Sequence, residues 1–264
     1  MNDKPQQKGA ETGRDAQGPR YEPVLNLPPV VLVLIGACVV IYAADAYLLS
    51  PHGRQLLFEN AAFSPQAVDV NAAALVTLVT YAFLHGSTAH VAVNMIWLAA
   101  FGSPLANRLG ALRFLAFWAL TSACAAAFYW LFHMWAPVVL VGASGAISGM
   151  MGAAARFGFR IERSHGKAAF SGAPLPIAVC LRLRSVVAFL SVWMLINLVT
   201  GLVGFTPGVG NKIAWEAHIG GFLAGFLGID WFDRRQRGPL PPLDPPGEDK
   251  KIEGETPPKS GEQA

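Results

Sequence analysis

The sequence predicts an all-α membrane protein built on six transmembrane helices, and three observations lead to that prediction. Hydrophobic residues make up 53% of the 264 residues, charged residues only 14%, and the mean hydropathy is +0.40. Soluble domains usually carry about 25% charged residues. Six apolar runs approach the roughly 20 residues that a bilayer span needs. Lysine and arginine are concentrated in alternate connections between these runs.

The predicted spans cover residues 28–49, 87–107, 111–132, 144–158, 184–204 and 214–232. The fourth is the shortest because basic residues begin at Arg156. Two other apolar segments are not predicted to cross the membrane. Residues 71–86 are too short and interrupted for a span, and we expect an interfacial or re-entrant helix there. Residues 168–179 are broken by two prolines, and we expect a loop on the membrane surface.

The orientation follows from the basic residues. If the N-terminus is cytoplasmic, 18 of the 20 lysine and arginine residues fall in cytoplasmic segments, and only Arg54 and Lys212 fall outside. Positive charge near the ends of spans is retained in the cytoplasm, so both termini are predicted to lie there. The net charge of +3 then reflects membrane topology and does not indicate a nucleic-acid partner.

The predicted domain organisation is one membrane domain, residues 25–236, between two disordered cytoplasmic tails. Residues 1–24 are polar and show no periodicity, and residues 237–264 are rich in proline, glycine and charge. Acidic residues are too frequent near the N-terminus for an organelle transit peptide, so we expect a bacterial inner-membrane protein. The three cysteines are scattered and form neither a disulfide framework nor a metal motif.

Two polar residues stand where spans begin, at matching depth. Ser144 opens the fourth span within "GASG", where glycines let backbone N–H groups approach a developing negative charge. His218 opens the sixth span within "AHIGG". Both spans run from outside to inside, so both residues lie near the outer face. A neutral histidine is the usual base for a serine nucleophile, which makes the pair a candidate catalytic dyad.

Small residues indicate how these two spans come together. Gly145 and Gly149 lie one helical turn apart beside the serine, and Gly221 and Gly225 repeat that spacing beside the histidine. Such stripes allow the backbones of membrane helices to approach closely. We therefore predict that the four glycines pack the fourth span against the sixth.

His90 and Asn94 form a third polar cluster, near the outer end of the second span. They are four residues apart in "HGSTAHVAVNM" and share one helical face. An imidazole and an amide directed at one point are suitable hydrogen-bond donors to an oxyanion.

Other protease chemistries lack their residues. A membrane metalloprotease would carry HExxH in a span, and the sequence contains none. An aspartyl protease would need two facing aspartates, but Asp45 and Asp230 lie near opposite ends of their spans. No metal site is therefore expected.

Taken jointly, "GASG", "AHIGG" and "HGSTAHVAVNM" resemble the rhomboid family of intramembrane serine proteases, over about residues 75–232. The resemblance implies a six-helix rhomboid core, with Ser144 as nucleophile and His218 as general base. His90 and Asn94 match the pair that helps to form the oxyanion hole. The implied substrate is a transmembrane segment of another protein, cut near its outer end within the lipid bilayer, and no metal or nucleotide is needed.

Two departures from the family pattern leave questions open. Ser148 stands where relatives often have a tyrosine that stacks on the histidine, so another group must hold His218. Ala106 replaces a glutamate common at the inner side of the second span. Two alternatives also stay open: a non-catalytic binder or chaperone on the same fold, and a small transporter or channel, whose polar residues would continue to the inner side.

Overall fold

The computed structural model describes residues 27–67, 75–164, 166–203 and 214–233. The predicted tails, 1–24 and 237–264, lie outside these residues. In chain order the elements are α1 (Pro29–Ala43), η1 (Ala44–Leu48), α2 (Pro51–Ala61), η2 (Pro65–Ala67), α3 (Thr77–Thr80), η4 (Tyr81–Phe83), α4 (Thr88–Trp97), η5 (Leu98–Gly102), α5 (Ser103–Leu109), α6 (Ala111–His133), α7 (Ser144–Arg156), β1 (Ile161–Ser164), β2 (Lys167–Phe170), α8 (Ile177–Cys180), α9 (Arg184–Val203) and α10 (Trp215–Phe232).

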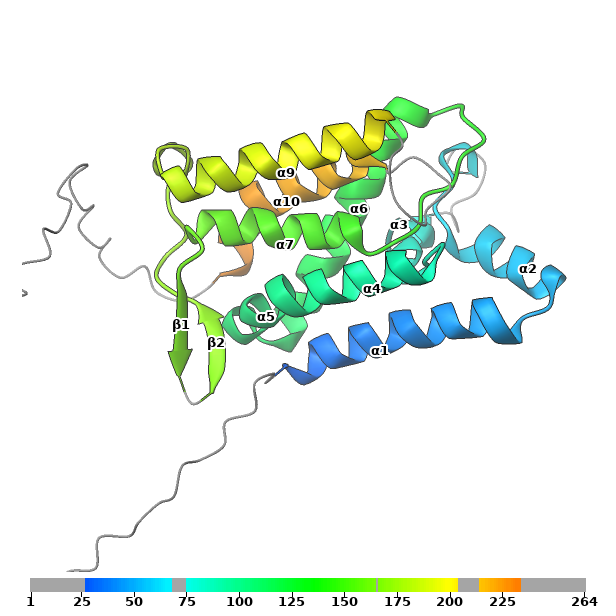
Figure 1. The fold of residues 1–264 in the computed structure, drawn as a ribbon, viewed down its shortest axis with the longest axis horizontal. Helices are drawn as coiled ribbons and strands as arrows, with labels where there is room; N and C mark the ends of the chain where they lie inside the picture. Colours follow the sequence, from blue (N-terminus) through cyan, green and yellow to red (C-terminus); the bar gives the residue numbers. More distant parts are fainter. Residues whose placement is uncertain (1–26, 68–74, 165, 204–213, 234–264) are drawn as a thin grey trace, which may run out of the picture.

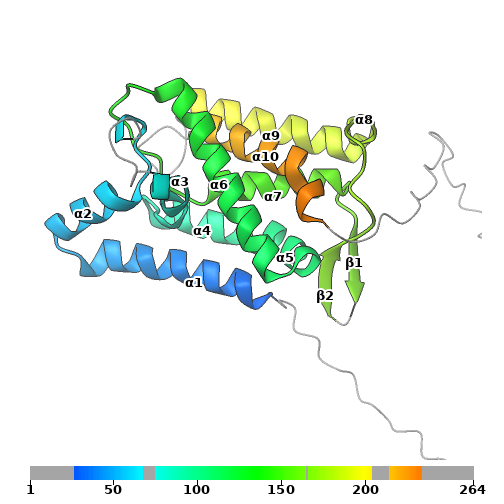
Figure 2. The same cartoon turned by 180° about the vertical axis from the view of Figure 1, so that it is seen from behind.

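The long helices form a bundle in which successive helices alternate in direction (Figures 1 and 2). We call the end at which α7 begins the Ser144 end, and the end at which β1 and β2 lie the hairpin end. α1, α6 and α9 run toward the Ser144 end, whereas α4, α7 and α10 run toward the hairpin end (Figure 1). α2 lies at the Ser144 end, and the described chain both begins and ends at the hairpin end.

The predicted spans coincide with helices or runs of consecutive helices. Four helices in the described part of the chain are long and apolar enough to cross a membrane: Pro29–Leu48, Thr88–Leu109, Ala111–His133 and Arg184–Gly201. α7 has only 13 residues, a length of about 20 Å at 1.5 Å per residue. α10 carries Glu216 and Asp230 and is not among the four. The protein is thus a helical membrane protein with several spans.

α7 is the centre of the bundle. Every residue from Gly145 to Arg156 is buried, against α10 and α6. The small residues of α7 and α10 permit this packing, since a Cβ on Gly221 would overlap the carbonyl oxygen of Gly145, and a Cβ on Gly225 that of Gly149. The two backbones are therefore in direct contact.

A π-helical turn, η5, interrupts the second span between α4 and α5. Pro104 lies in the first turn of α5 and has no N–H to donate to the preceding turn. A single π-helical turn inside an α-helix can accommodate such a break without ending the helix. The span continues to Leu109, where Gly110, with φ of +78°, ends it.

An antiparallel hairpin of β1 and β2 departs from the all-α prediction. Its register pairs Ile161 with Phe170, and β2 includes the first residues, 168–170, of the segment that we expected to be a loop. Phe170 stacks on Phe157 at 5.3 Å between ring centroids, and Asn107 of α5 donates to the carbonyl of Ala168 at 2.9 Å. These contacts from the helices stabilise two strands that would be marginal alone.

Two arginine–aspartate pairs join α10 to the rest of the hairpin end. The Arg108 guanidinium donates to Asp233 at 2.7 Å and to the carbonyls of Phe170 and Gly172. The Arg156 guanidinium donates to Asp230 at 2.5 Å and to the carbonyls of Leu175 and Phe226. Both arginines are buried, so the pairs compensate charges that could not otherwise lie there.

The Ser144 end is covered by α2 and short segments. Asp45 is buried in η1 and accepts two hydrogen bonds from Arg54 of α2. The predicted interfacial segment, residues 71–86, lies partly outside the described residues, and its described part is helical from Leu75 through α3 to the end of η4. Tyr81 connects it to α6 by donating to the carbonyl of Ser122 at 2.9 Å.

Candidate active site

Ser144 is the first residue of α7, where the chain turns into the interior of the bundle. The turn depends on Gly142, whose φ of +112° lies in the region that only glycine adopts without strain. The His90 ring packs against this glycine, since a Cβ there would lie 2.7 Å from its Cε1 and Nε2. The half-buried Ser144 hydroxyl therefore stands at a helix start, two residues from the contact with His90.

His218 lies in the first turn of α10 and approaches Ser144 from the neighbouring helix. Its Nε2 is 2.8 Å from Ser144 Oγ, which is hydrogen-bond distance. The backbone contacts at Gly221 and Gly225 set the separation of the two helices. The fold thus brings together the serine and the histidine that the sequence analysis selected.

His90 and Asn94 lie one turn apart on α4, but their contacts differ. Asn94 is buried, and its amide donates to the backbone carbonyl of His90 at 2.9 Å. The His90 N–H is capped by the Ser87 hydroxyl at 3.2 Å, which fixes the first turn of α4. The His90 ring therefore lies beside the loop before Ser144, whereas the one hydrogen bond found for Asn94 is within its own helix.

His85 is a second buried imidazole next to this cluster. Its ring meets the His90 ring edge to face, with 5.1 Å between centroids. Burial, and to a smaller extent the neighbouring His90, lower the pKa of His85. His85 is thus neutral at neutral pH and adds no positive charge beside His90.

Asn197 of α9 is a member of the site that our sequence analysis missed. Its Oδ1 lies 2.5 Å from Nδ1 of His218, on the opposite side of the ring from Ser144. The side chain is buried, although half of the described residues of α9 are exposed on the surface of the bundle. A polar residue turned inward on such a helix is a signal for a functional contact.

The comparison with known proteins bears on this geometry. Residues 72–233 match the sequence model of the Rhomboid domain, well over half of the chain. The chain belongs to the rhomboid family. The matched segment contains Ser144, His218, His90 and Asn94.

Curated relatives support this membership at moderate identity. This rhomboid chain is 28% identical over 161 residues to "Rhomboid protease GlpG" of Serratia proteamaculans, covering 60% of the chain and 48% of the relative. It is 32% identical over 176 residues to "RHOMBOID-like protein 5" of Arabidopsis thaliana, covering 66% and 50%. For "Rhomboid protease GlpG" of Yersinia pestis the identity is 28% over 156 residues, covering 59% and 48%. The chain spans about half the length of these relatives.

The structure of this rhomboid shows what surrounds Ser148 and Ala106, the two residues that depart from the family pattern. Ser148 is buried one turn after Ser144 on α7, and a serine is too small to stack on the His218 ring. Asn197 contacts that ring instead. Ala106 is buried in α5, where Arg108 makes the main polar contacts of the hairpin end.

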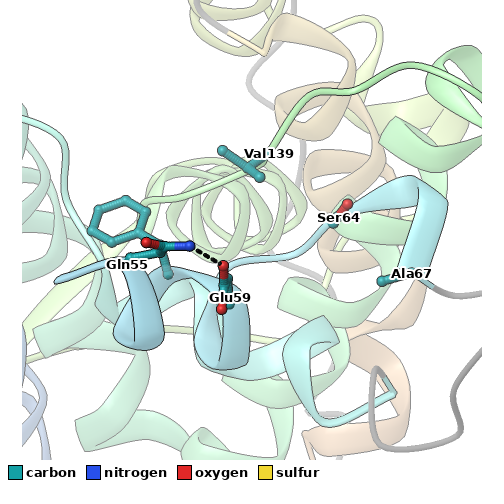
Figure 3. A pocket seen from close by; sticks show the side chains of 6 residues that line it. Gln55, Glu59, Ser64, Ala67 and Val139 are labelled. Atoms are coloured by element: carbon teal, nitrogen blue, oxygen red, sulfur yellow. Dashed lines mark hydrogen bonds between the residues drawn. The ribbon is translucent and has the colours of Figure 1, made fainter. Parts of the chain in front are cut away.

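A hollow at the Ser144 end lies apart from the residues of the candidate site (Figure 3). Its floor carries a hydrogen bond from Gln55 to Glu59 at 2.7 Å. The lining comes from α2, η2 and the segment before α7: Gln55, Phe58, Glu59, Ser64, Ala67 and Val139. None of these is a residue of the candidate site, so the hollow is not its cavity.

Proposed function

We propose that this rhomboid is an intramembrane serine endopeptidase that cuts transmembrane segments of other membrane proteins. The observation that carries the proposal is the 2.8 Å contact between His218 Nε2 and Ser144 Oγ. A serine hydroxyl becomes an effective nucleophile when a base within hydrogen-bond reach can accept its proton. Membership of a family whose relatives include named proteases supports the same reaction.

The proposed dyad takes part in both steps of peptide hydrolysis, the acylation of Ser144 and the hydrolysis of the acyl ester. Ser144 Oγ attacks the peptide carbonyl carbon while its proton passes to His218 Nε2. The C–N bond then breaks, and His218 gives that proton to the leaving amine, which leaves an acyl ester on Ser144. Water attacks the ester, its proton passes to His218, and the proton returns to Ser144 Oγ as the new carboxyl group leaves.

The oxyanion of each tetrahedral intermediate needs donors near Ser144. The first turn of a helix leaves N–H groups without partners in that helix, and α7 begins at Ser144. His90 lies against Gly142, and the Asn94 amide has a second N–H besides the one bound to the His90 carbonyl. We propose that these groups form the oxyanion hole, where losing one donor costs about 10²–10³ in rate.

The proposed topology has six spans, in which α7, buried throughout, and α10 cross the membrane together with the four longer helices. Eight of the nine lysine and arginine residues in the described part of the chain lie at the hairpin end, and Arg54 lies at the other. By the positive-inside rule, the hairpin end and both termini are cytoplasmic, in a bacterial inner membrane. Cleavage would then occur near the outer end of the substrate segment.

The proposed partners are the lipid bilayer and a transmembrane protein substrate, with no nucleic acid. The reaction as written requires only water and the residues named, and no cofactor. The described residues contain no group of three or more His, Cys, Asp and Glu side chains that could hold a metal. Asp45 and Asp230 pair with arginines at opposite ends of the bundle.

Labelling with a fluorophosphonate probe tests the proposal without knowledge of the substrate. The detergent-purified wild type should be labelled, and Ser144→Ala and His218→Ala should not be. Ser148→Ala is the matched control for a serine on α7, and His52→Ala for a histidine elsewhere. A folded wild type that resists the probe would favour the non-catalytic binder instead, and solute flux in proteoliposomes would favour the transporter.

A further inference from the structure

Asn197 is the residue in the site whose role the reaction above leaves open. Among the side chains of α9 that the structure describes, it is the buried polar one. Its partner is the Nδ1 atom of His218, which the proposed chemistry does not use. Burying an amide costs free energy unless its polar atoms form hydrogen bonds. The two hydrogen bonds of the Asn197 side chain therefore indicate why it is buried.

The orientation of the amide follows from those contacts. The Nδ2 group donates to the backbone carbonyl of Trp193 at 2.7 Å. Turning the amide over would place Oδ1 against that carbonyl, with two acceptors facing each other. Oδ1 therefore faces His218, where it can only accept a hydrogen bond.

This orientation decides the tautomer of the histidine. Because Oδ1 only accepts, Nδ1 must carry the ring proton, at a distance of 2.5 Å. The neutral ring then has its lone pair on Nε2, the atom 2.8 Å from Ser144 Oγ. The hydrogen bonds run in one direction, from the Ser144 hydroxyl through His218 and Asn197 to the Trp193 carbonyl.

Packing between α9 and α10 holds Asn197 at this place. Trp193 lies against Phe222 at 4.8 Å between ring centroids. One turn beyond Asn197, a Cβ on Gly201 would lie 2.8 Å from Cγ of Trp215. The residues 193, 197 and 201 share one face of α9, so the polar contact lies between two aromatic contacts.

We propose that Asn197 is a positioning residue for His218, which fixes the tautomer and the ring orientation that general-base catalysis by Nε2 requires. The role rests on the proposed function. It answers the question raised by Ser148, because a hydrogen bond at Nδ1 replaces an aromatic ring stacked on the imidazole. The side chain does not contact Ser144 and takes no part in bond making.

Two substitutions separate positioning from general stability. Asn197→Leu keeps the branched shape of the side chain and removes the acceptor, and the rate of fluorophosphonate labelling should fall by about 10², the cost typical of a misplacement of about 1 Å. Asn197→Asp keeps an acceptor and adds a negative charge beside the ring, which favours the imidazolium. His218 would then stay protonated to higher pH, so the acid limb of the labelling rate should move to higher pH. Thr200→Val is the matched control on the next turn of α9, since its hydroxyl bonds to its own helix.

Each outcome of these experiments either supports or overturns the positioning role of Asn197. A folded Asn197→Leu protein with the labelling rate and pH profile of the wild type would overturn the role of Asn197 while leaving the proposed function intact. If Asn197→Leu does not fold, an Asn197→Asp profile that coincides with the wild-type profile overturns it. Failure of the wild type itself to react would overturn both proposals, whereas the predicted loss with the predicted shift would support them.

Discussion

Replacing Gly221 with alanine should separate α7 from α10 at the level of the candidate dyad. The added Cβ would lie 2.8 Å from the carbonyl carbon of Gly145 and closer still to its oxygen. Carbon atoms in contact lie about 3.5 Å apart, so the helices must separate by at least about 0.7 Å. Gly145 follows Ser144 directly, and Gly221 lies one turn after His218, so the shift reaches both residues.

The expected loss follows from the present geometry. A displacement of that size would lengthen the 2.8 Å contact between Ser144 and His218 to roughly 3.5 Å, beyond the usual hydrogen-bond range. The labelling rate should fall by about 10-fold to 100-fold. Overpacking should also lower the free energy of unfolding by about 1–3 kcal/mol.

The assay is fluorophosphonate labelling at a temperature well below unfolding, together with unfolding in detergent micelles. Gly228→Ala is the matched control on α10, because its Cβ would meet Trp231 at an ordinary 3.6 Å. Alanine favours a helix over glycine by about 1 kcal/mol. A Gly221→Ala protein that is more stable than the wild type and equally reactive would refute the close packing described here.

Three further predictions concern other contacts. Gly142→Ala should lower the labelling rate about 10-fold or more, through strain at positive φ and collision with the neighbouring imidazole, while Gly36→Ala, with nothing within 4 Å, should not. Arg108→Met removes one partner of a buried ion pair and should lower the free energy of unfolding by about 3–5 kcal/mol. Arg54→Gln, at a pair whose arginine is half exposed, should change stability little. Burial raises the pKa of the Cys180 thiol, so a maleimide at neutral pH should modify it only after unfolding; rapid modification of the folded protein would contradict its burial.

The sequence alone was sufficient to select the two residues of the candidate dyad, which the structure brings into contact. Ser144 and His218 are far apart in the chain, but both begin a span of the same direction, which sets them at one depth. The small residues beside each then indicated which spans touch, and the structure has those backbones in contact. Depth and helix packing are encoded locally in a membrane protein, and this made the inference possible.

Asn197 shows what local patterns do not reveal. It lies in an apolar stretch where a single amide reads as an ordinary contact between helices, and its partner depends on how α9 rotates against α10. The hairpin was missed for a related reason, since its strands depend on contacts with Phe157 and Asn107. A signal for Asn197 was present, because it is a polar residue in the outer half of its predicted span, as are Ser144 and His218.

The dependence of α7 on α10 has a consequence for biogenesis. α10 is the last of these helices to leave the ribosome, yet it supplies His218 and the partners of Arg108 and Arg156. The helices inserted earlier therefore lie in the bilayer with both arginines lacking their aspartates and with Ser144 lacking its contact to His218. Under the proposed function, the nascent chain would be inactive until the final helix docks, and it could not cut neighbouring membrane proteins during its own synthesis.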